Sequence, residues 1–311
     1  MMTLSRYFLP NGSVSFWHTE LRPIFYSYPT LQDYYIDFTA KTHYDGPYDS
    51  QGIPLLDYKG AIGRQYNPCA VAQFALGWFT RWKRGDATAR TRFEKTACWL
   101  HDRLAIDSVG HGWWWYHFDF DAYGLTSPWK SALAQGQGIS VLLRAYKEFG
   151  DDRYLKAAHA AYAGMVTPVE QGGLLRHFDG GIILEEVIAD RPTAILDGLM
   201  FAIFGVQDFC FATGDEGASK LRHECLGTLE RLLPRFDLHY WSRADLYHDA
   251  PPMIASPFYH RLHVAQLEVL RDLTGSVVFD QYARRWKEQD AHVWNRIRAI
   301  GNKAYFKLRY Y

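Results

Sequence analysis

Residues 144–162, RAYKEFGDDRYLKAAHAAY, run from one amphipathic stretch through a glycine and two aspartates into a second amphipathic stretch. Apolar residues recur three or four positions apart on both sides of the glycine, which predicts two helices. A glycine just past a helix ends it in a left-handed turn, and an aspartate directly after that glycine can cap the next helix. We therefore predict a helix-turn-helix unit with its turn at Gly150.

The same unit occurs four times in the chain. Its other copies are WFTRWKRGDATARTRFEKTACWL (78–100), DFCFATGDEGASKLRHECL (208–226) and LRDLTGSVVFDQYARRW (270–286), with turn glycines Gly85, Gly214 and Gly275. Successive glycines are 65, 64 and 61 residues apart, as expected of a repeat joined by loops of unequal length. Repeated helix pairs bury their faces by stacking or by closing into a ring. We predict a mainly α fold, an α/α barrel (toroid) of about four helix pairs.

The phase of the repeat indicates where a site would lie. Eighteen residues before each glycine the chain reaches Asn67, Ala132, Leu196 and Pro257, each at or near the start of the first helix of its pair. If the units are equivalent, these four helix starts meet at one mouth of the barrel. The segments gathered there contain many of the polar and aromatic residues of the chain, so this mouth is the expected ligand site.

Composition excludes several classes of function. The 311 residues contain 34 Lys plus Arg and 34 Asp plus Glu, so no basic field exists that would attract nucleic acid. No window of 18 apolar residues occurs, and we expect no transmembrane segment. The expected location is the cytoplasm, where a lipid-linked glycan could bring the protein to the inner membrane surface. A homodimer is left open.

Other features of the sequence concern ligands and redox state. Aromatic residues reach 16% of the chain, which suits either sugar binding or core packing. The four cysteines form no CxxC pair and are expected to be buried, reduced thiols. No Walker loop, dinucleotide fingerprint or GxSxG elbow occurs, so no cofactor is expected. Residues 1–60, rich in Tyr, Gly, Pro and Asp, are expected to form hairpins and loops laid over a barrel domain of residues 61–311.

Several polar residues near the predicted mouth are candidates for a site. Gln135, Gly136 and Gln137 open a helix among small residues, which would allow either a ligand or another helix to approach closely. Glu186, beside Glu185, could accept a proton, although adjacent glutamates are more often a solvated pair. Asp197 lies within an apolar run, where a carboxylate needs a partner, a cap or a ligand.

The stretch SPFYHRLHVAQL (256–267) combines a helix start with reactive side chains. Tyr259 offers a phenol and Arg261 a fork for a carboxylate. His260 and His263 are three residues apart on one helix face, but no third ligand is spaced to complete a metal set. We therefore expect a site wall without metal.

Five segments resemble, in order, the C-terminal helical domain of D-glucuronyl C5-epimerases. They are YNPCAVAQFALGWF (66–79), PWKSALAQGQGISVLLRAY (128–146), EEVIADRPTAILDGLMFAIFGVQDF (185–209), RFDLHYWSRADLYH (235–248) and FYHRLHVAQLEVL (258–270). The resemblance covers roughly residues 60–290. It implies an α/α barrel whose mouth binds a uronic-acid-containing glycan. It also implies proton removal at C5 and return from the opposite face, with tyrosines and a glutamate as the acid/base groups.

Position by position, the resemblance assigns catalysis to Glu186 and Tyr259. The family's AQGQ block falls on Gln135, Gly136 and Gln137, and its asparagine-glycine pair falls on Asp197 and Gly198.

Two tyrosines of the family are replaced, by Val187 and Ala244. Tyr247, His260 or His263 could take over the second acid/base role, while His260, Arg261 and His263 would contact the uronate.

The leading hypothesis is epimerisation of glucuronate to iduronate type in a polysaccharide or lipid-linked glycan. The alternatives are a glycan lyase or hydrolase on the same scaffold and a non-catalytic glycan-binding protein.

Overall fold

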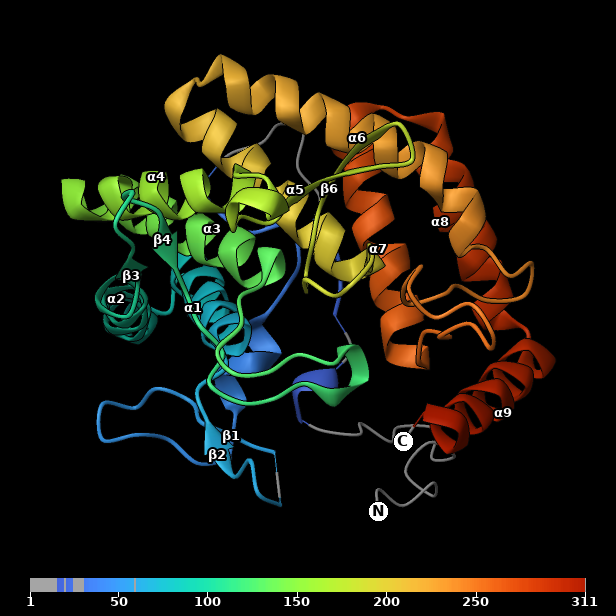
Figure 1. The fold of residues 1–311 in the computed structure, drawn as a ribbon. Coiled ribbons are helices and arrows are strands. Elements are labelled where there is room, and N and C mark those ends of the chain that lie inside the picture. Colours follow the sequence, from blue (N-terminus) through green and yellow to red (C-terminus); the bar gives the residue numbers. More distant parts are fainter. Residues whose placement is uncertain (1–15, 20, 25–30, 59, 311) are drawn as a thin grey trace.

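The computed structural model describes residues 16–310 except 20, 25–30 and 59. This described chain is mainly helical, with nine α-helices and three two-stranded antiparallel hairpins (Figure 1). The helices are α1 (Pro68–Lys83), α2 (Ala87–Asp102), α3 (Ala132–Phe149), α4 (Asp152–Val166), α5 (Leu196–Thr213), α6 (Glu216–Phe236), α7 (Pro257–Thr274), α8 (Val277–Ala291) and α9 (Val293–Tyr310). The strands are β1 (Leu56–Asp57), β2 (Arg64–Gln65), β3 (Ala105–Ile106), β4 (Gly112–Trp113), β5 (Leu175–Phe178) and β6 (Gly181–Leu184).

The turns within the helix pairs have the predicted chemistry. Gly150, Gly214 and Gly275 end α3, α5 and α7 with φ of 68°, 68° and 70°, a conformation that glycine adopts without steric cost. The side chains that cap α2, α4, α6 and α8 are those of Asp86, Asp151, Asp215 and Ser276. The four predicted helix pairs are therefore confirmed, and α9 is an additional helix that the repeat did not predict.

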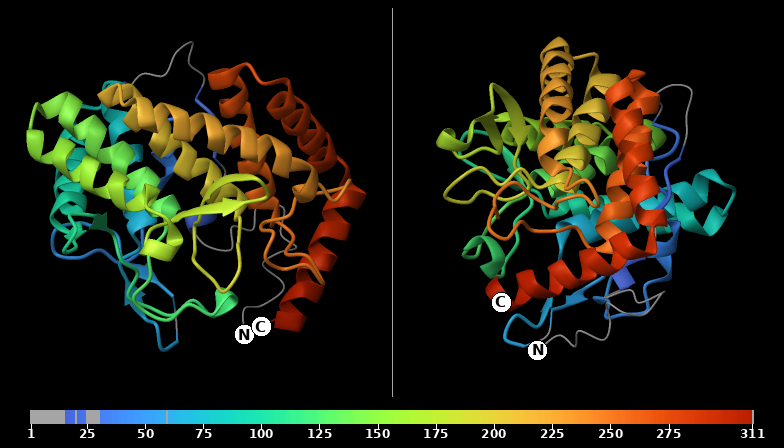
Figure 2. Two further views of the ribbon diagram at one scale, coloured as in Figure 1. Left: turned by 45° about the horizontal axis from the view of Figure 1, so that its top comes forward. Right: turned by 90° about the vertical axis from the view of Figure 1, so that its right-hand side faces the viewer.

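Helices α1, α3, α5 and α7 form an inner row, and their partners α2, α4, α6 and α8 lie outside it (Figures 1 and 2). The tightest contact joins α3 to α5, where a Cβ added at Gly205 would lie only 2.3 Å from the Cα of Gly136. Two backbones can approach this closely only because both positions lack a side chain. The arrangement is consistent with the predicted α/α toroid.

Residues 31–44 lie between α1 and α7. The Phe38 carbonyl oxygen would be 2.4 Å from a Cβ at Gly77 of α1, and the Lys41 ammonium is 5.9 Å from the Phe258 ring of α7. Tyr34 is completely buried, as is Phe38. The apolar side chains of this stretch therefore complete the core of the ring, and burying them is more favourable than exposing them on its rim.

A buried ion pair anchors the start of this inserted stretch, residues 31–44. The Arg144 guanidinium of α3 lies 2.5 Å from the Asp208 carboxylate of α5, and both side chains are at most 2% exposed. Tyr35 donates its hydroxyl to Asp208 at 2.7 Å, and Arg144 donates to the Asp33 carbonyl at 3.0 Å. The pair is thus fully hydrogen-bonded, as a buried charge pair must be if it is not to destabilise the fold.

The structure also bears on the apolar helix α5 and on the four cysteines. Helix α5 is long and apolar enough by composition to be a candidate membrane span, but 78% of it is buried inside the protein, as in a core helix. The four cysteines are free thiols as predicted, yet only Cys225 is fully buried. The expected burial of the other three is wrong because each lies near a helix end at the edge of the core.

Candidate active site

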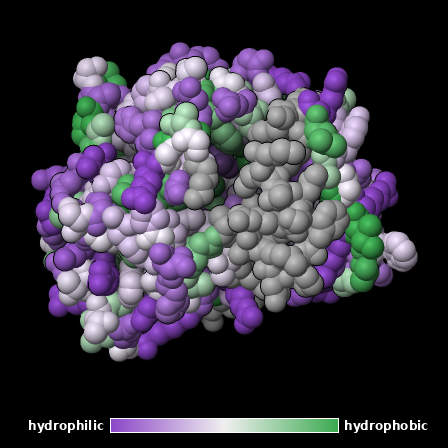
Figure 3. All heavy atoms as spheres, turned by 90° about the horizontal axis from the view of Figure 1, so that it is seen from below, coloured by the Kyte–Doolittle hydropathy of each residue, from purple (hydrophilic) through white to green (hydrophobic). Residues whose placement is uncertain are grey.

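The starts of the inner helices converge, as the phase of the repeat predicts. Asn67 caps α1, Ser131 caps α3 and Ser256 caps α7, each through its side-chain oxygen. The loops that lead into α3, α5 and α7 and the β1–β2 hairpin all lie at the lower end of the molecule in Figure 1. Figure 3 views the protein from this end, where hydrophilic side chains dominate the described surface.

Glu186 follows β6 and leans over the first turn of α5. A Cβ added at Gly198 would lie 2.0 Å from its Oε2, so glycine is needed there to make room for the carboxyl group. Oε2 is buried and has no hydrogen-bond partner among the described residues. Burial first, and then the charges of Asp197, Asp245 and Glu185, raise the pKa of Glu186 well above its usual value. Once ionised, this carboxylate is a strong base that no described side chain neutralises.

Glu185, the adjacent residue, has a different environment. Its carboxylate accepts hydrogen bonds from the Thr193 hydroxyl at 2.7 Å and from the Thr193 and Ala194 N–H groups at 3.1 Å. It also forms an ion pair with Arg176 at 2.9 Å. Glu185 therefore holds the loop between β6 and α5 in shape and leaves Glu186 to face the site.

Tyr259 lies in the first turn of α7, where its N–H is capped by Ser256. Its ring meets the edge of the His18 ring at 5.6 Å and the Phe258 ring at 5.1 Å. Burial, followed by the negative charges of Asp197 and Glu186, raises the pKa of Tyr259 well above 10. The phenol stays protonated at neutral pH and can act as a proton donor beside Glu186.

Asp197 connects the site to a buried chain of polar groups. Its Oδ1 is 3.8 Å from Nε2 of His263, and Nδ1 of His263 is 2.9 Å from the Ser242 hydroxyl. The same hydroxyl lies 2.8 Å from Nδ1 of His260, whose Nε2 lies 2.9 Å from the Trp286 carbonyl.

The hydrogen bonds of this chain orient the rings of both histidines. Because the Trp286 carbonyl can only accept, His260 carries its proton on Nε2, and its Nδ1 accepts from Ser242. The Ser242 hydroxyl then accepts from Nδ1 of His263, whose Nε2 faces Asp197 and has no hydrogen-bond partner among the described residues. Burial is the main cause that lowers the pKa of His260 to about 3, so this ring stays neutral and orients His263. Within the described residues, no group of three or more His, Cys, Asp and Glu is arranged to hold a metal ion.

Several predicted contact residues have partners within the protein. The Gln135 amide accepts from the Trp114 N–H at 3.1 Å and donates to the Gly112 and Ala161 carbonyls at 2.9 and 3.0 Å. Gly136 forms the close contact between α3 and α5.

Arg261 and Tyr247 also point to structural partners. The Arg261 side chain is 39% exposed and lies 3.9 Å from Asp290 of α8. Tyr247 donates to Asp190 at 2.9 Å and packs under Arg191 at 4.7 Å. Tyr247 also packs against the apolar cluster that includes Val187, the residue after Glu186.

Gln137 is the member of its block that faces the site. Its side chain is completely buried, and its carbonyl oxygen accepts from the Cys69 thiol at 3.3 Å. Its amide nitrogen has no hydrogen-bond partner among the described residues.

Residues from the first helix and the loop before it also line the site, and among them only Asn67 was predicted to lie at the mouth. Cys69 lies in the first turn of α1, where burial first, and then the charges of Glu186 and Asp197, raise the pKa of its thiol. Next to it, Asn67 donates to the Tyr58 hydroxyl at 2.7 Å. The repeat placed Asn67 at the mouth, but no local pattern distinguishes Cys69 or Tyr58 from other residues.

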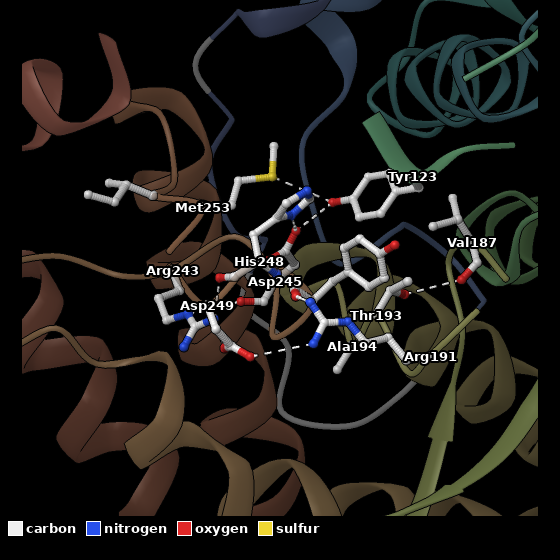
Figure 4. A network of polar contacts seen from close by, with 12 residues as sticks. Tyr123, Val187, Arg191, Thr193, Ala194, Arg243, Asp245, His248, Asp249 and Met253 are labelled. Carbon is white, nitrogen blue, oxygen red and sulfur yellow. Dashed lines mark hydrogen bonds and ion pairs between the residues drawn. The ribbon is translucent and has the colours of Figure 1, made fainter. Parts of the chain in front are cut away.

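Asp245 is a second carboxylate that the sequence did not single out. Figure 4 shows Tyr123 and His248 pointing at it, with hydrogen-bond distances to its Oδ2 of 2.8 and 2.7 Å. Its charge contributes to the raised pKa of Glu186. The position occupied by a tyrosine in the resembled family, Ala244, is immediately before it and packs as a buried apolar residue.

Lys41 is a buried cation at the edge of the same site. Its ammonium donates to the Trp17 carbonyl and lies 5.5 and 5.9 Å from the rings of Trp17 and Phe258. No carboxylate of the described residues forms an ion pair with it, and burial lowers its pKa to about 7. A single lysine gives no signal in the sequence, because only the fold shows that it is buried.

The family profile described as D-glucuronyl C5-epimerase C-terminus matches residues 107–288, more than half of the chain. The chain belongs to the D-glucuronyl C5-epimerase family. The region shared with the D-glucuronyl C5-epimerase family includes Glu186, Asp197 and Tyr259, whereas Lys41 and Cys69 precede it.

Two curated relatives illustrate the extent of the similarity. An uncharacterized protein of Methanocaldococcus jannaschii is 32% identical over 179 residues, 56% of this chain and 57% of that protein. The D-glucuronyl C5-epimerase of Caenorhabditis elegans is 32% identical over 173 residues, 51% of this chain and 28% of that enzyme. The aligned region therefore covers less than two thirds of either D-glucuronyl C5-epimerase family relative.

Proposed function

We propose that this protein epimerises a hexuronic acid residue of a glycan at C5. The observation that carries the proposal is the Glu186 carboxyl group, which has an oxygen without a described hydrogen-bond partner and lies within electrostatic reach of the protonated Tyr259 phenol. Family membership supports the same reaction class. The proposal includes a polysaccharide or lipid-linked glycan as the substrate and the conversion of glucuronate to the iduronate type.

The chemistry requires a base on one face of C5 and an acid on the other. The C5 proton is acidic because it is alpha to the uronate carboxylate. Ionised Glu186 accepts it, since a raised pKa makes its carboxylate a better base. Tyr259 donates its proton to the opposite face, and the two groups exchange roles in the reverse reaction.

After each turnover Glu186 holds the proton that Tyr259 has lost, and His263 is placed to relay it back by way of Asp197. The Nε2 atom of His263 faces Asp197, and Ser242 and His260 hold the ring in one orientation. This arrangement gives His263 a supporting role to Glu186 and Tyr259 in place of the family tyrosines that Val187 and Ala244 replace.

Lys41 supplies the positive charge that the reaction intermediate needs. Removal of the C5 proton places negative charge on the uronate carboxylate, and a buried ammonium stabilises that charge more than one in water. Lys41 has no described anionic partner of its own. A bound uronate would provide that partner and raise the pKa of Lys41 again.

Deuterium incorporation from heavy water into glucuronate-containing glycans, read by mass spectrometry, tests this proposal. We expect exchange at C5 that Tyr259→Phe and Glu186→Gln abolish. Tyr282→Phe, on outer helix α8, is the matched control and should exchange at the wild-type rate. Retained binding without exchange in the wild type would favour a glycan-binding protein, and an unsaturated or shortened product would favour a lyase or a hydrolase.

A further inference from the structure

Helix α9 has two faces with opposite environments. On its inner face, Ala299 and Phe306 are each 1% exposed, and Asn302 donates to the Tyr240 hydroxyl at 2.8 Å. Lys303 donates to the Ile254 carbonyl at 2.8 Å. This face fixes the helix against the loop that joins α6 to α7, and therefore also fixes which residues point outward.

The outward face carries an apolar stripe that no other described element covers. It consists of Trp294, Ile297, Tyr305 and Leu308, which are 80%, 53%, 59% and 80% exposed. Their spacing of three, eight and three residues keeps them on one side of an α-helix. Gly301 lies between them, and a Cβ added there would meet nothing within 4 Å. Few soluble surfaces expose a tryptophan and a leucine this completely in one line.

Positive charge accompanies this apolar stripe. Residues 293–310 contain five Lys or Arg and no Asp or Glu, although the whole chain has no net charge. Arg298 and Arg309 are exposed beside the stripe. A helix with aromatic and aliphatic residues on one side and cations along its edges has the character of helices that lie in the interface of a bilayer.

The position of α9 agrees with such a role. The helix lies at the lower end of the molecule in Figure 1, the end at which the starts of the inner helices converge. Figure 2 shows it lying across this end, and the view from below in Figure 3 has hydrophobic side chains along the same margin. Its inner face also contacts the loop that carries Asp245, because the Phe306 ring is 5.1 Å from that of His248.

We infer that the outward face of α9 docks on an anionic phospholipid membrane. The four apolar side chains insert at the level of the head groups, and the flanking arginines meet lipid phosphates. Docking in this orientation places the mouth of the barrel next to the bilayer. The inference concerns a surface outside the proposed active site and does not depend on the reaction.

Vesicle co-sedimentation tests the inference with the full chain. We expect binding to vesicles of equal parts phosphatidylcholine and phosphatidylglycerol, little binding to phosphatidylcholine alone, and weaker binding as salt is raised. Replacing Arg298 or Arg309 by Gln should lower affinity about fivefold each, and Trp294→Ser with Leu308→Ser should abolish binding. Val277→Ser, which changes an 80% exposed residue at the start of α8, is the matched control and should bind like the wild type.

The molar mass in solution separates this inference from self-association. Light scattering should give the same mass for the wild type and for the variant Trp294→Ser with Leu308→Ser. The inference is overturned if neither vesicle binds the wild type, or if this variant binds as well as the wild type. It is equally overturned if the variant converts a dimer to a monomer and the wild type does not bind vesicles.

Discussion

Glu185 and Glu186 are neighbours in the chain, but the fold places their carboxylates in opposite situations. Glu185 is bonded to Thr193, Ala194 and Arg176, whereas one oxygen of Glu186 has no described partner. A buried polar group without a partner lowers stability, so its retention indicates a functional role. The same two-residue motif thus contains one group that builds the site and one that can react.

The amide substitutions of this pair should separate the two roles. Glu186→Gln should lower C5 proton exchange about 10²- to 10⁴-fold without lowering thermal stability, because it removes a base and no described bond. Glu185→Gln should lower the free energy of unfolding by about 3 kcal/mol, because it leaves Arg176 without its anion. Deuterium exchange and chemical denaturation of both variants check this, and equal loss of stability in the two would contradict it.

The pH dependence follows from the raised pKa of Glu186. Folding favours its protonated form, so the contribution of this group is fully present below its unfolded pKa near 4.5 and is lost as pH rises through the higher folded pKa. At pH above the folded pKa, Glu186→Gln should therefore be more stable than the wild type. The rate of exchange should rise over the same pH range as the base ionises, and a rate that is complete already at the usual carboxyl pKa would exclude Glu186 as the base.

Residue type alone was enough to single out some residues of the candidate site and not others. Asp197 was singled out because a carboxylate inside an apolar run is unfavourable unless it has a partner, a cap or a ligand. Gln135 was assigned to the ligand because its partners are backbone atoms of β4 and α4, distant in sequence, and no local pattern reveals them. Lys41 escaped notice because burial, and not residue type, gives it its character.

The contact between α3 and α5 determines how closely two inner helices approach. Gly136 and Gly205 meet without side chains, and a Cβ at position 205 would be 2.3 Å from the facing Cα. The starts of these helices carry Gln137 and Asp197, so the helix separation also sets the width of the site.

Two glycine-to-alanine substitutions test the importance of this contact, because one is expected to lower the free energy of unfolding and the other to raise it. Gly205→Ala should lower the free energy of unfolding by about 1–3 kcal/mol, because the facing backbone must move. Gly301→Ala, in the middle of α9 where a Cβ meets nothing, should raise it by about 0.5–1 kcal/mol through helix propensity alone. Denaturant titration of both variants would measure these changes. Stabilisation by Gly205→Ala would show that α3 and α5 have room to separate.

Helix boundaries were predictable because their signals are local. The turn glycines and the residues after them determine four helix ends and four helix starts without any contribution from distant residues. Helix α9 lies outside the repeat and has no such glycine before it. The place of residues 31–44 was not predictable either, since it depends on a gap between α1 and α7 that exists only in the assembled ring.

The Arg144–Asp208 pair holds three parts of the chain together, because it joins α3, α5 and the stretch that begins at Asp33. Asp208→Asn should lower the free energy of unfolding by about 3–5 kcal/mol, because a buried guanidinium loses its counter-charge. Asp151→Asn breaks the exposed pair with Arg153, keeps a capping residue, and should change stability by less than about 0.5 kcal/mol.

Hydrogen exchange should locate the effect of Asp208→Asn. We expect amides of residues 33–44 to exchange faster in this variant, while those of α2 keep their protection. Uniform acceleration over the whole chain would mean that the inserted stretch opens only with global unfolding.

The inserted stretch also constrains how the protein is made. Residues 31–44 leave the ribosome early, yet Tyr35 bonds to a residue 173 positions later, and Lys41 rests on Phe258 of the seventh helix. The newborn chain must therefore keep an apolar stretch unburied until most of the helices have been synthesised, a period in which it is exposed to aggregation and to chaperones. A shortened chain that lacks α7 would form helices but could not enclose this stretch completely. The solubility of the growing chain would therefore depend on the synthesis of α7, the last of the inner helices.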